Sequence, residues 1–121
     1  MTDNIMNSEV VIPSVMADLE WVWVLASSVA RGRDALFVVE MEEEDLERRR
    51  RIVPIFEARE AAAGLKEKLC QGKAGKYIEQ SMRLSEVGRF AAKNNLEIML
   101  LDEAGRIMAH MEARLEQHSL H

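Results

Sequence analysis

The C-terminal third of the chain, residues 81–117, carries a repeat of apolar and small residues that constrains the fold more than any other feature. Successive members of the repeat are alternately three and four residues apart, which is the period of a helix face packed along its whole length. Two polar residues stand in the repeat, which consists of Leu84, Val87, Ala91, Asn94, Ile98, Leu101, Gly105, Met108, Glu112 and Leu115. The spacing predicts one long helix.

A second apolar row lies beside the first on such a helix. It consists of Leu96, Leu100, Ala104, Ile107 and Met111. The two rows together are wider than the stripe of about 100° that a helix with one solvated side shows. The helix therefore has more than one neighbour. It lies either at the centre of a bundle or with part of its width docked against a helix of another protein.

A β-hairpin is a competing interpretation of the same segment. Strands over 96–101 and 106–111 would be joined by a turn at 102–105, as in the hairpins of sensory domains. Apolar and polar residues alternate poorly in this segment, because Met99, Leu100 and Leu101 are consecutive. The hairpin stays open as the alternative to the helix.

The first half of the chain also shows helical spacing. After a polar leader at 1–13, Ser14 is a plausible N-cap for a helix over 14–31. The middle of this segment, 21–25, is apolar on nearly every side and rich in residues that favour strands, so a strand is an alternative there.

A second helix is expected over 34–70. The charged block at 42–51 would form ion pairs between residues four apart on it, such as Glu44 with Arg48. Pro54 removes a backbone donor and predicts a kink. Two glycines at 71–76 then break the helix, in a segment that lacks the spacing of a phosphate-binding loop.

These segments predict an all-α fold, an antiparallel helical bundle of three main helices with a long C-terminal helix. The helices would cover about 14–31, 34–70 and 76–118. They would form a single domain over 14–118 after a flexible leader at 1–13.

Composition limits the classes of function. The formal net charge of −5 argues against a nucleic-acid binder, which needs a basic face. No apolar run approaches the roughly 20 residues that span a bilayer, and the N-terminus lacks the features of a signal peptide. The single cysteine, Cys70, has no partner for an internal disulfide, so we expect a reducing compartment.

No enzyme-like motif is present. The three histidines, His110, His118 and His121, do not have the spacing of a metal site, and we expect no metal and no cofactor. No nucleophile stands beside a base in the sequence, so we expect no catalytic residue.

Polar and small residues in the C-terminal repeat have expected packing roles. Asn94 would fix the register in which the packed face of the long helix meets its neighbour, and Asn95 follows it in the same segment. Gly105 is costly inside a helix, so we expect another backbone to approach it closely.

Several short segments resemble the flagellar type III export chaperones of the FlgN type. The resemblance covers most of the chain from Val15 to Leu115 and depends on Gly32-Arg33-Asp34, Leu46-Glu47-Arg48, Ala92-Lys93-Asn94-Asn95, Ile98-Met99, Gly105-Arg106 and Arg114-Leu115. It implies a cytoplasmic, non-enzymatic chaperone that holds the C-terminal amphipathic helix of a hook-filament junction protein. Such a chaperone would deliver its client to the export gate or to ATPase components of the export apparatus.

The resemblance also implies which residues contact the client. They are Leu96, Met99, Leu100, Ile107 and Met111. The physical mechanism would be the docking of the client helix in a groove of the bundle. The alternatives are another helical adaptor such as a FliT-like secretion chaperone, a homodimeric structural bundle without a client, and a sensory hairpin module.

Overall fold

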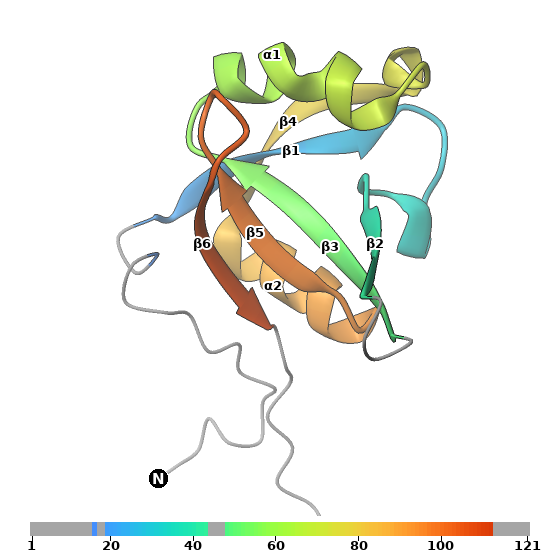
Figure 1. Cartoon of the computed structure of the whole chain (residues 1–121), viewed down its shortest axis with the longest axis vertical. Coiled ribbons are helices and arrows are strands. Elements are labelled where there is room, and N and C mark those ends of the chain that lie inside the picture. Colours follow the sequence, from blue (N-terminus) through green and yellow to red (C-terminus); the bar gives the residue numbers. More distant parts are fainter. Residues whose placement is uncertain (1–15, 17–18, 44–47, 113–121) are drawn as a thin grey trace, which may run out of the picture.

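The computed structural model describes Met16 and residues 19–43 and 48–112 of the 121-residue chain. The described residues form one mixed sheet with an α-helix on each face (Figure 1). The strands are β1 (Trp21–Ser27), β2 (Val39–Glu43), β3 (Arg48–Phe56), β4 (Tyr77–Arg83), β5 (Glu97–Leu101) and β6 (Ile107–Glu112). The helices are α1 (Arg59–Cys70) and α2 (Leu84–Lys93), with short 3₁₀ turns η3 (Gly32–Asp34) and η4 (Ala74–Lys76).

The predicted all-α bundle of three main helices is therefore wrong. The segment expected to form a helix over 14–31 contains β1, and the segment 34–70 contains β2 and β3 before α1. The long helix expected over 76–118 is replaced by β4, α2, β5 and β6. The two strand alternatives, at 21–25 and in a hairpin over 96–111, are the ones observed.

Some expectations lie outside the described residues. They concern the leader at 1–13, the cap at Ser14, the end of the last helix at 113–118, and His118 and His121. The acidic partners expected at 44–47, including Glu44 of the expected pair with Arg48, also lie outside the described residues. The part of the charged block that is described lies in two paired strands, where Glu42 is in register with Arg49 and Glu43 with Arg48. Acidic and basic positions of this block are thus paired across strands instead of along a helix.

The sheet has the strand order β4-β1-β3-β5-β6, and β2 pairs with β3 beside β1. β3 and β5 are parallel, and the other pairs are antiparallel. A parallel pair needs a crossover connection. Here the crossover contains α1, β4 and α2. In Figure 1, α1 crosses one end of the sheet near β1 and β4, whereas α2 passes behind β3 and β5.

The second half of the central strand β3 is apolar because both of its faces are covered there. Every residue from Ile52 to Phe56 is buried, and such an uninterrupted run is typical of a strand between two layers of helix. Pro54 lies between Ile52, which pairs with β2, and Phe56, which pairs with Trp23 of β1. Proline is tolerated there because the pairing on that side of β3 passes from one strand to the other. The predicted helix kink at Pro54 is therefore wrong.

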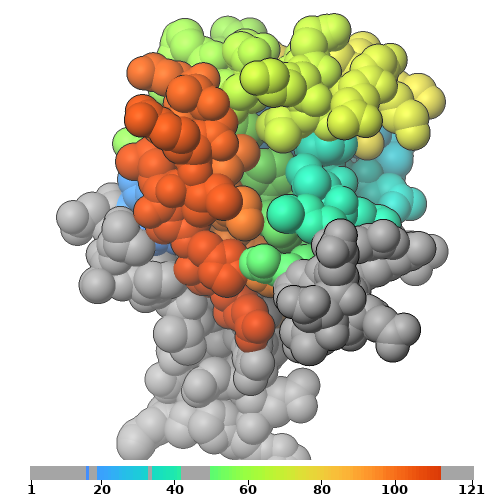
Figure 2. Space-filling model, viewed as in Figure 1, coloured from blue at the N-terminus to red at the C-terminus, as the bar shows by residue number. Residues whose placement is uncertain are grey.

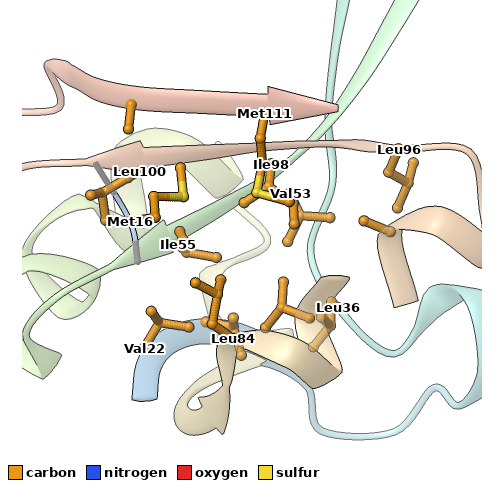
Figure 3. Packing of buried hydrophobic residues seen from close by; sticks show 14 of the residues in the cluster. Met16, Val22, Leu36, Val53, Ile55, Leu84, Leu96, Ile98, Leu100 and Met111 are labelled. Atoms are coloured by element: carbon orange, nitrogen blue, oxygen red, sulfur yellow. The ribbon is translucent and has the colours of Figure 1, made fainter. Parts of the chain in front are cut away.

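Two apolar clusters form the core, one on each face of the sheet. The cluster against α2 is seen in Figure 3, where Leu84 lies beside Val22 and below Ile55, and Met111 of β6 lies beside Ile98. Met16 contributes a fully buried side chain to it. The cluster against α1 includes Leu25, Ile52, Phe56, Ala62, Leu65, Met99 and Leu101. Neither described helix has the length and apolar character that a bilayer crossing requires.

The turn between β5 and β6 explains Gly105. The N–H of Asp102 donates to the carbonyl of Arg106 at 2.9 Å, and the N–H of Gly105 donates to the carbonyl of Asp102 at 2.9 Å. Gly105 has φ = +85°, in the left-handed region, and a Cβ there would lie 3.4 Å from Cδ2 of Leu65. Gly105 is thus required by a turn, not by a helix crossing.

We expect Gly105→Ala to lower the free energy of unfolding by about 1 to 2 kcal/mol, because an alanine is strained at this positive φ. Gly64→Ala is the matched control. Gly64 lies inside α1, where an added Cβ would meet no neighbouring atom within 4 Å, so alanine there stabilises by up to about 1 kcal/mol. Urea denaturation of both variants measures the difference. Equal effects of the two substitutions would contradict the assigned turn.

Candidate functional site

The residues expected to contact a partner gather on the β5–β6 hairpin and at its entrance. Only Ile107 has a large exposed fraction, 59%. The other four are buried inside the subunit and contribute to its two apolar clusters: Leu96, Met99, Leu100 and Met111. The structure thus brings the five residues together but leaves Ile107 as the exposed member.

The two asparagines follow the last residue of α2 and precede β5. Asn95 is in the left-handed conformation, with φ = 59°. Its N–H donates to the carbonyl of Ala92 at 3.4 Å, and the N–H of Leu96 donates to the carbonyl of Ala91 at 2.7 Å. These are the two bonds of a Schellman motif, which satisfies the last carbonyls of a helix. The side-chain Nδ2 of Asn94 donates to the carbonyl of Phe90 at 2.9 Å. Both residues therefore stabilise the C-terminal end of α2. The continuous packed face of a long helix, to which Asn94 was expected to belong, is absent.

A charged cluster connects three strands on the α1 side of the sheet. Arg50 of β3 donates from Nε to Oε2 of Glu97 at 3.0 Å and from Nη2 to Oε1 at 2.6 Å. His110 of β6 contacts Oε1 of Glu97 through Nε2. Sequence reasoning missed this cluster, because Arg50 and Glu97 are 47 positions apart and meet only through the parallel pairing of β3 with β5.

The cluster keeps Glu97 ionised. The two hydrogen bonds from Arg50 are the largest cause, and those bonds together with His110 lower the pKa of Glu97 from 4.5 to about 2 against the opposing effect of burial. The carboxylate is 18% exposed and Arg50 is 29% exposed, so the pair is partly shielded from water. An ion pair in this setting stabilises more than one on an open surface.

His110 has two competing partners in the cluster. Its Nε2 lies 3.0 Å from Nη2 of Arg50 as well as against Glu97. A guanidinium only donates hydrogen bonds and an ionised carboxylate only accepts them. Nε2 therefore bonds to Arg50 when it carries a lone pair and to Glu97 when it carries a proton. Either way, His110 holds β6 to the rest of the sheet.

The cluster connects β3, β5 and β6 through a guanidinium, a carboxylate and an imidazole. Cys70 lies elsewhere, as the buried last residue of α1, and burial raises the pKa of its thiol. Within 16, 19–43 and 48–112, no group of three His, Cys, Asp or Glu side chains is placed to hold a metal ion.

β6 forms one edge of the described sheet (Figure 1). Its register with β5 shifts between Leu100 and Leu101, where a bulge leaves Ile107 and Met108 exposed. In Figure 2 this strand and its turn, coloured orange-red, lie at the surface along one side of the molecule. An edge strand offers unpaired backbone groups to another strand.

The opposite edge strand, β4, carries an inward-directed charge that opposes pairing with a further strand. Glu79 points under α1, where Oε2 accepts a bond from Nζ of Lys66 at 2.8 Å and Arg59 lies 3.9 Å away. The bond from Lys66 is the largest cause of a lowered pKa at Glu79. A charge directed inward from an edge strand opposes pairing with a further strand. The edge strands β4 and β6 therefore differ in their capacity for strand addition.

Comparisons with known proteins return no family model, no curated protein and no solved structure that matches this chain. They neither support nor contradict the resemblance to the FlgN-type chaperones. The geometry of the described residues is therefore the basis for any proposal about function.

We expect Glu97→Gln to lower the free energy of unfolding at pH 7 by about 1 to 3 kcal/mol, because it removes the charged acceptor of Arg50. The folded pKa of about 2 lies below the unfolded value of 4.5. The contribution of Glu97 is therefore complete above pH 4.5 and is lost as the pH falls toward 2.

Chemical denaturation between pH 7 and pH 2.5 measures this effect, and the loss of stability over that range should be smaller in Glu97→Gln than in wild type. Glu86→Gln is the control, since it changes the net charge equally at an exposed position of α2. If Glu97→Gln and wild type lose the same stability between these pH values, the cluster does not act as described.

Proposed function

We propose that this chain is a non-enzymatic protein-interaction domain that associates with a second copy of itself along the outer edge of β6. The observation that carries the proposal is the exposure of Ile107 and Met108, 59% and 51%, on an edge strand. The backbone of such a strand supplies hydrogen bonds to a partner strand, and exposed apolar side chains supply buried area.

The second copy is favoured by the charges of the strand itself. An antiparallel two-fold pair centred on Ala109 would bring Arg106 of each copy opposite Glu112 of the other. Arg106 bonds to Asp102 at 2.8 Å, but its side chain is 80% exposed and can contact a second carboxylate. Unlike charges opposite each other stabilise paired strands. The same pairing would bring Met108 opposite His110.

The association would be weak. One six-residue edge strand buries less area than a standard protein interface, so the dimer would depend on concentration. β4 would take no part, because Glu79 is directed inward there. Pairing of β6 with β6 also closes the assembly at two copies, whereas pairing of β6 with β4 would continue into fibres.

The flagellar export function implied by the resemblance receives no support from this fold. Its mechanism requires a client helix in a groove of a helical bundle, and the segment expected to provide that groove is a β-hairpin. A cytoplasmic location remains part of the proposal. It is supported by a single cysteine that is buried and free, as in proteins of reducing compartments.

Size-exclusion chromatography with light scattering tests the proposal over a concentration series up to about 1 mM. We expect a monomer–dimer equilibrium in wild type. We expect the double variant Ile107→Lys, Met108→Lys to weaken the dimer at least tenfold, about 1.4 kcal/mol, because lysines on an edge oppose strand pairing.

Ile78→Lys is the matched control on β4, where Ile78 is 50% exposed, and it should dimerise as wild type does. A wild-type protein that stays monomeric over the whole series would overturn the proposal. Equal loss of the dimer in the β4 variant would overturn the assignment to β6.

A further inference from the structure

A cavity of about 340 Å³ lies on the side of β3 away from β5 and β6. Its walls come from the end of β1 and the segment after it, from β2 and β3, and from the junction of η4 with β4. The lining residues are Ser27, Val29, Ala30, Asp34, Leu36, Val38, Glu40, Arg51, Lys76 and Tyr77. The volume falls at the lower end of the range for small-ligand sites.

Hydrogen bonds of the protein itself shape one wall of the cavity. Oγ of Ser27 accepts from the N–H of Val29 at 3.2 Å and from the N–H of Ala30 at 2.8 Å. Ser28 bonds to the carbonyl of Lys76 through both its N–H and its hydroxyl, which ties this segment to η4. The protein's own hydrogen bonds therefore hold this wall in place, and small-molecule sites are usually largely pre-formed in this way.

The cavity has an apolar base. Leu36 is buried and pairs with Ala26 of β1, and Val38 packs against the same core cluster. The ring of Tyr77 is fixed by an edge-to-face contact with Phe37, with centroids 5.2 Å apart. Val29 is 80% exposed in a segment that lines the cavity. A short aliphatic group would cover these apolar side chains.

Arg51 and Lys76 are the two cations that line the cavity. Within the described part of the chain, neither Arg51 nor Lys76 has a side-chain hydrogen bond or ion pair. Arg51 is half-buried in β3, where an unpaired guanidinium is costly, and a bound carboxylate would satisfy it through two parallel hydrogen bonds. Two acids, Asp34 and Glu40, also line the cavity, so its formal charge is balanced and a dianion gains little.

We propose that this cavity binds a small organic monoacid, a molecule with one carboxylate and a short branched aliphatic body. The carboxylate would contact Arg51 and Lys76, and the aliphatic part would cover Leu36 and Val38. This site is independent of the proposed dimer edge, because no residue of β5 or β6 lines the cavity.

Titration of the full chain with isovalerate, followed by amide resonances in NMR, tests the proposal. We expect saturable shifts at Ala30, Leu36 and Val38, with a Kd in the millimolar range or below. Arg51→Gln should weaken binding at least tenfold and Lys76→Gln should weaken it less, because arginine bonds a carboxylate at two atoms. Inorganic phosphate, largely a dianion at pH 7.5, should bind more weakly than isovalerate.

Arg59→Gln is the control, since it removes an exposed cation of α1 outside the cavity, and it should bind as wild type does. The spectra of the free variants establish that each is folded. Absence of saturable shifts with about 50 mM isovalerate would overturn the proposal. Equal binding of phosphate, or unchanged binding in folded Arg51→Gln, would also overturn it.

Discussion

The parallel pairing of β3 with β5 is the constraint on which the rest of this structure depends. These strands lie side by side in register from Ile52 with Glu97 to Phe56 with Leu101. Parallel strands cannot be joined by a tight turn, so the chain must leave the sheet and return. In doing so it places α1 on one face and α2 on the other, and it adds β4 at the far edge of the sheet. The buried faces of β3 and β5 are the result.

The same pairing positions the charged cluster, the cavity and the exposed edge of β6. It brings Glu97 to Arg50, and β6 then adds His110 to them. On its other side β3 is shared between β2 and β1, which pair with different parts of it. The cavity lies where these neighbours and the start of β4 meet, and the exposed edge of β6 lies at the opposite side of the sheet. Two separate candidate surfaces therefore follow from one topology.

The C-terminal repeat misled the sequence analysis for a physical reason. Leu84, Val87 and Ala91 do lie on one buried face of a helix, α2. Ile98 and Leu101 continue the spacing by coincidence, because β5 is buried on both faces and its apolar residues do not alternate. The long helix was predicted from a pattern that combines a helix face with a buried strand. The turn at 102–105, which was included in the hairpin alternative, was the signal against it.

Two other local features of the sequence indicated the structure that is observed. The break at 71–76 is confirmed, with Gln71 and Gly72 both at positive φ, and the helix-forming residues before it lie in α1. The strand-forming residues at 21–25 lie in β1. Contacts between distant residues could not be predicted, because a single sequence does not show which strands are neighbours. This is why the cluster of Arg50, Glu97 and His110 and the cavity were found only in the structure.

Hydrogen exchange of the amides in β6 tests most directly whether this segment is a strand with one bonded side and one open side. In a dilute sample, amides from Ala109 to Glu112 that bond to β5 should exchange slowly and their neighbours should exchange fast, because successive N–H groups of an edge strand point in opposite directions. Slow exchange at every consecutive amide from 107 to 112 in the dilute monomer, as in a helix, would contradict this account.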